Sequence, residues 1–80
     1  MNINENANIS GSQTNRILAY MREGNAITSA EARKLFGCDR LAARIADIEK
    51  KIGRAPDRRR IRVKNRDDKW VSVAQYYLAN

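Results

Sequence analysis

Residues Ile27 to Gly53 read ITSAEARKLFGCDRLAARIADIEKKIG. Apolar side chains recur at helical spacing on both sides of Gly37. A residue without a β-carbon takes up the backbone angles of a sharp turn at little cost, so Gly37 is expected to separate two helices. A short helix, a glycine turn and a second helix form a helix-turn-helix, whose second helix has the size to enter a DNA major groove.

The first helix of this pair is expected at residues 29–36. The hydroxyl of Thr28 is placed to accept from the backbone N–H of Glu31, and the Glu31 carboxylate can reach back to Thr28. This reciprocal arrangement is a capping box, which marks the start of a helix. The apolar side chains expected in the core are Ala32, Leu35 and Phe36.

The second helix is expected at residues 40–52, capped by Asp39 or Cys38. Its apolar stripe has the spacing i, i+4, i+7 and i+11 and consists of Leu41, Ile45, Ile48 and Ile52. The side chains expected to point away from this stripe are Ala43, Ala46, Asp47 and Lys50. Small residues on this face would let the helix approach the floor of a groove closely.

A further helix is expected before this pair, at residues 15–23, with Gly24 as its left-handed stop. Residues 25–27 suit an extended connection that could form a single strand bridge. Residues 1–12 are rich in asparagine and poor in large apolar side chains, so we expect a disordered arm there. The folded domain is then expected to cover residues 13–80.

The periodicity changes after Gly53. Residues 54–59 are expected to form a loop, and they hold the chain's one proline. Residues 60–64 alternate strictly between cations and apolar side chains, as in a half-buried strand, and residues 69–78 are expected to form the return strand. An irregularity in the pairing is expected near Ala74. Three helices followed by a two-stranded hairpin predict an α+β winged helix-turn-helix.

The composition favours a polyanionic partner. The chain has 80 residues and a net charge of +7, and each cation that neutralises a phosphate releases condensed counterions. The alternative is that the excess charge only keeps the protein soluble. The single cysteine permits no intrachain disulfide, and without histidine there is no credible zinc site. No apolar run approaches the roughly 20 residues of a membrane span.

An enzyme is the least favoured class of protein. The chain has no histidine, no pair of thiols and no glycine-rich phosphate loop, so no catalytic constellation is expected. We expect a cytoplasmic protein that is not an enzyme, needs no metal or cofactor, and does not insert into a membrane.

Six short elements follow one another in a distinctive order: Ile27-Thr28, Glu31-Ala32, Phe36-Gly37, Arg40 to Ile48, Gly53, and Tyr76 to Leu78. This order resembles a family of small winged helix-turn-helix DNA-binding proteins that is common in bacteriophages and prophages. Glu49 stands where typical members carry a basic residue. The resemblance implies a sequence-specific double-stranded DNA-binding protein that acts in transcription regulation or as an accessory factor in recombination.

On this hypothesis, the candidates for reading bases are Arg40, Ala43, Arg44 and Lys50. Arginine bonds bidentately to guanine O6 and N7. The alternative for Arg44 is to pack along the apolar stripe and pair with an acid such as Glu31. Asp47 could accept from cytosine N4, but a pair with Lys51 or Arg44 is favoured.

The candidates for phosphate contacts are Arg33, Lys34, Lys51, Arg58, Arg59, Arg60, Arg62, Lys64 and Arg66. Most of them fall in the expected hairpin, where cations could also serve only to protect a sheet edge from pairing. Trp70, Tyr76 and Tyr77 are expected in the core or the sheet. The alternative for Trp70 is to anchor a protein partner, so binding of a host protein through the basic hairpin stays open, as does the choice between monomer and homodimer.

Overall fold

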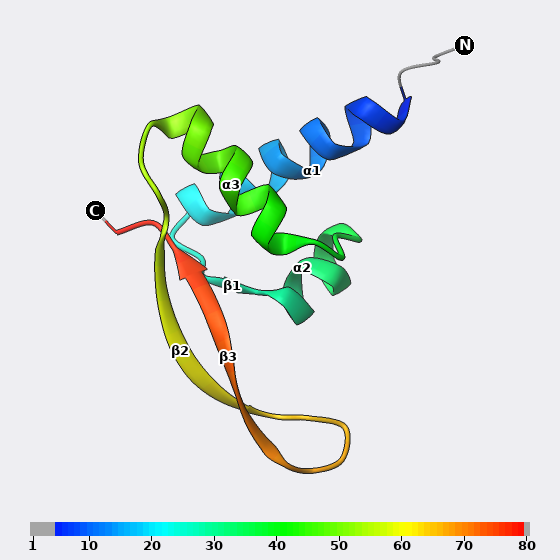
Figure 1. Ribbon diagram of the computed structural model, residues 1–80, viewed down its shortest axis with the longest axis vertical. Helices are drawn as coiled ribbons and strands as arrows, with labels where there is room; N and C mark the ends of the chain where they lie inside the picture. Colours follow the sequence, from blue (N-terminus) through cyan, green and yellow to red (C-terminus); the bar gives the residue numbers. More distant parts are fainter. Residues whose placement is uncertain (1–4, 80) are drawn as a thin grey trace.

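The computed structural model describes residues 5–79, and the side chains from residue 11 onward. This part of the chain forms three helices and three strands in the order α1 (Glu5–Arg22), β1 (Ile27–Thr28), α2 (Ser29–Phe36), α3 (Leu41–Ile52), β2 (Asp57–Lys64) and β3 (Trp70–Tyr77). The helices make a body from which the hairpin of β2 and β3 extends as a long twisted arm (Figure 1). The expected α+β architecture is confirmed.

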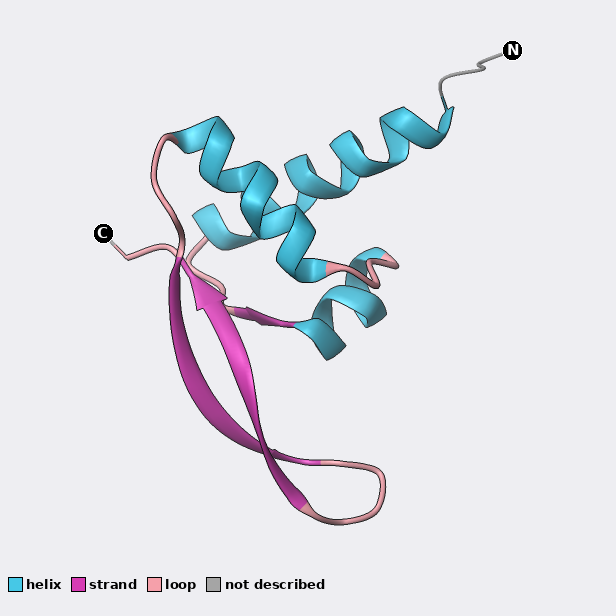
Figure 2. Cartoon of the chain, viewed as in Figure 1, coloured by secondary structure: helices cyan, strands magenta, loops and turns pink. Residues whose placement is uncertain are grey.

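The sheet is antiparallel, with the strand order β1-β3-β2. Ile27 and Thr28 pair with Tyr76 and Gln75, so β1 adds a third strand at the base of the expected two-stranded hairpin (Figure 2). The expected irregularity at Ala74 was wrong, because Ala74 pairs with Arg60 in an unbroken ladder.

Strand β2 begins at Asp57, within the segment expected to be a loop. The pairing of Asp57 with Tyr77 carries the ladder to the base of the hairpin. Pro56, which has no N–H to donate to a ladder, stands immediately before this strand. The strand therefore runs back as far as the proline allows.

The core lies where the three helices meet β1. Its buried apolar side chains are Ile17, Leu18, Met21, Ile27, Ala32, Cys38, Leu41, Ile45 and Ile48. Phe36 is half-buried and its ring meets that of Tyr20 edge-on, with centroids 5.5 Å apart. The expected burial of Leu35 was wrong, since its side chain is 46% exposed. Ala32 and Phe36 lie one turn apart on the inner face of α2, which leaves Leu35 to one side.

The start of α2 agrees with the sequence. Thr28 N–H donates to Glu31 Oε1 at 2.9 Å, and Glu31 N–H donates to Thr28 Oγ1 at 3.3 Å, so the capping box is confirmed. Gly37 ends the helix in the left-handed region, with φ of 63°.

The expected cap of α3 was wrong. Arg40 is the cap residue, and its side chain makes no capping hydrogen bond. The Asp39 carboxylate pairs instead with Arg33 Nε of α2 at 3.0 Å. Cys38, the other candidate, is buried in the core, where its thiol faces apolar neighbours.

Helix α1 begins earlier than expected. Residues 1–4 of the expected disordered arm lie outside the described residues, but from Glu5 onward the backbone is helical. Once the packed segment around Ile17 has nucleated a helix, each added residue gains a hydrogen bond without a new nucleation cost. The helix therefore extends back to Glu5 through residues of low apolar content.

Thr28→Ala is expected to lower the free energy of unfolding by about 1 kcal/mol, because the N–H of Glu31 loses its acceptor at the start of α2. Thr28→Ser is the matched control, since serine keeps an acceptor oxygen at the same position. Urea denaturation followed by far-ultraviolet circular dichroism measures both variants. Equal stability of the alanine and serine variants would show that the capping box contributes nothing.

Candidate nucleic-acid interface

The solvent-facing side of α3 differs from the side that periodicity predicted. Ala42, Ala46, Glu49 and Lys50 are exposed, whereas Ala43 and Asp47 are half-buried. The hydrogen bond that joins Asp47 to Thr14 shows that α1 lies on the Asp47 side of α3. The free face is therefore turned away from α1, toward Ala42 and Ala46. Helical spacing alone could not reveal this rotation, because it depends on where α1 packs.

The four base-reading candidates occupy different environments. Arg40 is exposed at the start of α3, and Lys50 is exposed near its end. Ala43 lies half-buried between the free face and the side covered by α1.

Arg44 is held at the contact between α3 and α1. Its side chain is 16% exposed, and Nε lies 3.3 Å from Asp47 Oδ2. Thr14 Oγ1 of α1 donates to the same Asp47 oxygen at 3.3 Å. Of the two side-chain pairs considered for Asp47, with Lys51 or with Arg44, the one with Arg44 is present. The alternative for Arg44, a pair with an acid of α2 such as Glu31, is not the one present, because the Glu31 carboxylate belongs to the capping box and Arg44 pairs with Asp47 of its own helix.

The hairpin carries its charges mainly on one face. Side chains directly opposite one another in an antiparallel ladder share a face, and alternate residues share it along a strand. One face, here termed the basic face of the wing, consists of Arg58, Arg60, Arg62 and Lys64, opposite Tyr76, Ala74, Ser72 and Trp70. The other face carries the apolar pairs Ile61–Val73 and Val63–Val71.

Some candidate cations already have partners. Arg59 lies off the basic face, where its Nε donates to Gln75 Oε1 at 2.7 Å and its guanidinium lies 4.8 Å from the centre of the Tyr77 ring. Lys64 Nζ lies 3.3 Å from Asp68 and 5.6 Å from the centre of the Trp70 ring. Arg33 is paired with Asp39. These exposed contacts are weak, but they fix the direction of each side chain.

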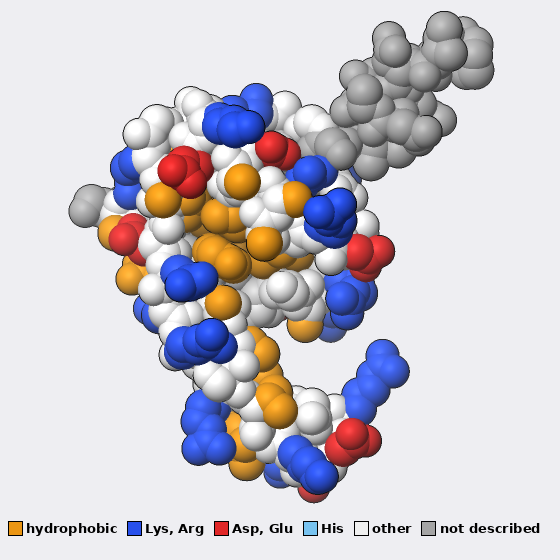
Figure 3. Space-filling view, in the orientation of Figure 1, with side chains coloured by type: hydrophobic (Ala, Val, Ile, Leu, Met, Phe, Trp, Pro, Cys, Tyr) orange, Lys and Arg blue, Asp and Glu red, His pale blue; other side chains and the backbone are white. Residues whose placement is uncertain are grey.

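Other candidate cations are exposed and make no ion pair with any side chain that the structure describes. They are Lys34, Lys51, Arg58, Arg60, Arg62 and Arg66. Lys and Arg side chains are spread along the hairpin and around the edge of the helical body (Figure 3). The free cations on the hairpin therefore form an extended positive surface.

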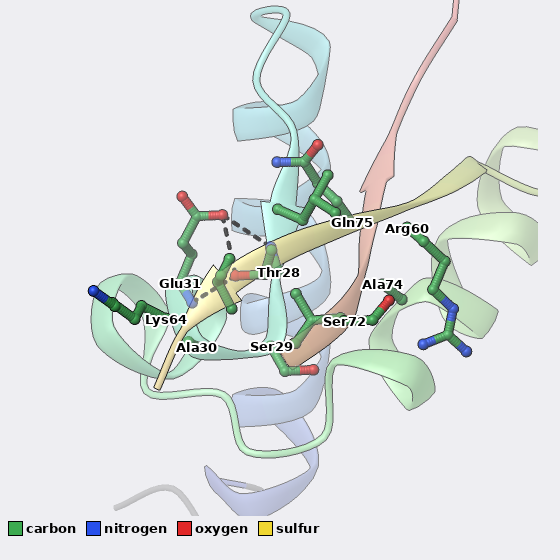
Figure 4. Close-up of a pocket in the computed structure, with 12 residues that line it drawn as sticks. Thr28, Ser29, Ala30, Glu31, Arg60, Lys64, Ser72, Ala74 and Gln75 are labelled. Atoms are coloured by element: carbon green, nitrogen blue, oxygen red, sulfur yellow. Dashed lines mark hydrogen bonds between the residues drawn. The ribbon is translucent and has the colours of Figure 1, made fainter. Parts of the chain in front are cut away.

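A groove of about 600 Å³ lies between the start of α2 and the hairpin (Figure 4). The capping-box residues Thr28 and Glu31 form one wall, and Ile61, Val73 and Ser72 belong to the other. The residues that line this groove include no set of side chains that could act together as acid, base and nucleophile. The groove separates the middle of the hairpin from α2, so the two strands project beyond the body as a wing.

Neither a membrane span nor a metal site is found among residues 5–79. None of the described helices is long and apolar enough to cross a membrane. Within the same part of the chain, no three side chains of the metal-ligating types come together.

Comparison with known proteins agrees with this architecture. Residues 12–80 match the family model described as a winged helix-turn-helix domain, which covers most of α1, the α2–α3 pair and the whole hairpin. No curated protein and no solved structure matches the chain. Domains of this family are typically DNA-binding and not enzymatic. Because the match extends over nearly the whole sequence, the chain belongs to the winged helix-turn-helix domain family.

Proposed function

We propose that the chain is a sequence-specific double-stranded DNA-binding protein of phage or mobile-element type. Helix α3 enters the major groove, and the wing lies along phosphates. The protein acts in the host cytoplasm as a transcription regulator or as an accessory factor in recombination. The observation that carries the proposal is the basic face of the wing, with cations at four alternate positions of β2.

The spacing of these cations suits a nucleic-acid backbone. Alternate residues of a strand lie about 7 Å apart, so the line from Arg58 to Lys64 is about 20 Å long. A single DNA strand carries one phosphate for roughly each 3.4 Å of helix axis, so a line of this length passes several phosphates. Protecting a sheet edge would not require cations on every alternate position of one face.

Helix α3 contributes fewer cations to DNA binding than the wing does, and its small side chains allow close approach to the groove. Arg40 and Lys50 are exposed and can reach base edges or phosphates at the two ends of its free face. The alanines between them leave room for close approach to the groove floor. Arg44 serves in this proposal as a positioning residue, because it pairs with the Asp47 carboxylate, and that carboxylate accepts the hydrogen bond from Thr14 of α1.

Further phosphate contacts come from cations on both sides of α3. Lys34 of α2 and Lys51 at the end of α3 are exposed, and Lys51 also lies where the helix dipole favours a cation. Arg33 can contribute after exchanging Asp39 for a phosphate, since their ion pair is exposed. Arg66 extends the positive surface to the tip of the wing.

Selection of binding sites from random duplex DNA tests the proposal. We expect one enriched sequence for the wild-type chain, and the spacing of any half-sites reports whether it binds as a monomer or a dimer. Failure to enrich any sequence would count against sequence-specific binding.

Arg40→Ala is expected to relax the preference at one position of the enriched site. A lost bidentate arginine–guanine pair removes about 1–3 kcal/mol of discrimination. Affinity for the best site, measured by fluorescence anisotropy, should fall while affinity for unrelated duplexes changes much less. Arg22→Ala on α1 is the control. An unchanged site preference for Arg40→Ala would exclude Arg40 as a base reader.

A second candidate function is binding of a host protein through the wing. It is favoured by Trp70, whose side chain is 58% exposed although tryptophan is more often buried. Exposed tryptophan is a common anchor of protein interfaces. Retention of one stoichiometric protein from nuclease-treated host lysate, abolished by Trp70→Ala and accompanied by no DNA affinity, would favour this function over the first.

A further inference from the structure

The acidic side chains of this basic protein are mostly committed to partners. Those with an ion pair or a capping contact are Glu31, Asp39, Asp47, Asp57 and Asp68. The Glu49 carboxylate makes neither a hydrogen bond nor an ion pair with any side chain that the structure describes. The carboxylates of Glu23 and Asp67 also have no such partner, and both residues lie in turns. Of the acids whose side chains the structure describes, Glu49 is the one without a partner that stands on the free face of a helix.

The helix around Glu49 offers it no counter-charge. Its neighbours at three and four residues along α3 are Ile45, Ala46, Ile52 and Gly53, and none of them is a cation. The exposed residues Ala42, Ala46, Glu49 and Gly53 have the spacing i, i+4, i+7 and i+11. They form a shallow strip of α3 from which the Glu49 carboxylate is the one long side chain that projects.

We propose that Glu49 determines base specificity by accepting a hydrogen bond from the exocyclic N4 amino group of a cytosine in the major groove. This inference rests on the proposed function. An ionised carboxylate only accepts hydrogen bonds, so it is repelled by phosphates and by base edges that present acceptors. In the major groove a cytosine presents its N4 amino donor, which is the group an acidic side chain pairs with.

The same carboxylate discriminates most strongly against guanine and thymine, since adenine offers one amino donor beside its N7 acceptor. Opposite the O6 and N7 of guanine or the O4 of thymine it would face acceptors and lose its hydration without compensation. Specificity is then gained from rejection of wrong sites as much as from attraction to the right one. Ala42 and Ala46 add apolar contact surface beside it, which suits a thymine methyl group.

The experiment is selection of binding sites from random duplex DNA with the full chain and its Glu49→Gln and Glu49→Ala variants. We expect the wild-type site to contain one cytosine whose replacement lowers affinity about tenfold or more. Glu49→Gln should change this position to adenine, because glutamine pairs bidentately with adenine N6 and N7. Glu49→Ala should accept several bases there, with the rest of the site unchanged.

Glu23→Gln is the matched control, since Glu23 is an exposed acid outside α3. Circular dichroism melting verifies that each variant keeps its fold. Identical site preferences for the wild type and both Glu49 variants would overturn the inference while leaving DNA binding intact. A wild-type chain that enriches no sequence would overturn the proposed function and this inference together.

Discussion

Ile48→Ala is expected to lower the free energy of unfolding by about 2–5 kcal/mol, because it opens a cavity at the centre of the core. Ile48 is 0% exposed and lies in the buried cluster that joins α3 to α1 and β1. A domain of this size has a total stability of roughly 4–12 kcal/mol, so the loss is a large fraction of it. Thermal denaturation followed by circular dichroism should show a melting temperature lower by well over ten degrees, or no folded baseline.

Leu35→Ala is the control for this substitution, because Leu35 has the same number of side-chain carbons and is 46% exposed. Its effect is expected to stay within about 0.5–1 kcal/mol. Equal destabilisation by the two variants would contradict the described core.

The double substitution Arg60→Ala with Arg62→Ala is expected to weaken DNA binding about 10- to 100-fold for all sequences alike. Both cations lie on the basic face of the wing and have no partner among the described side chains. Each lost phosphate contact makes the slope of log K against log salt less steep by about 0.9. Fluorescence anisotropy across a series of salt concentrations measures both effects.

The control for the wing is Arg16→Ala with Arg22→Ala, which removes the same charge from α1. It should lower affinity much less, through net charge, and circular dichroism melting verifies its fold because Arg16 also lies 5.4 Å from the centre of the Phe36 ring. If the α1 variant lost as much affinity as the wing variant, binding would depend on overall charge, and the wing would have no special role.

Local signals in the sequence predicted most of the helical part of the fold. The Thr28 capping box marks the start of α2, and Gly37 marks its end. The apolar stripe of α3 places Leu41, Ile45 and Ile48 in the core. These features act between neighbours in the sequence, so no knowledge of the rest of the fold is needed.

Features that depend on distant packing were not predictable in the same way. The free face of α3 is set by α1, whose Thr14 binds Asp47. Leu35 is exposed because the short α2 turns Ala32 and Phe36 inward. The pairing of β1 with Tyr76 and Gln75 joins segments far apart in the chain.

The sequence predicted that the candidate site is positively charged, but not which of its residues are free and which have a partner in the fold. The alternation of residues 60–64 anticipated a strand with cations on one face, and pairing extends that face back to Arg58. Arg59 and Arg44 looked equivalent to their neighbours in the sequence, yet each is engaged by a partner in the fold. In the sequence, Glu49 was notable only because it stands where similar proteins carry a basic residue. Its place on the free face of α3 is seen only in the structure.

The dependence of duplex DNA affinity on salt tests the central claim most directly. If the basic face of the wing lies along phosphates, log K for the wild-type chain should fall linearly with log salt, with a slope of about −3 or steeper, since each neutralised phosphate contributes about −0.9. A slope near zero, or no binding to duplex DNA even at low salt, would contradict the proposal that this winged helix-turn-helix domain binds DNA through its wing.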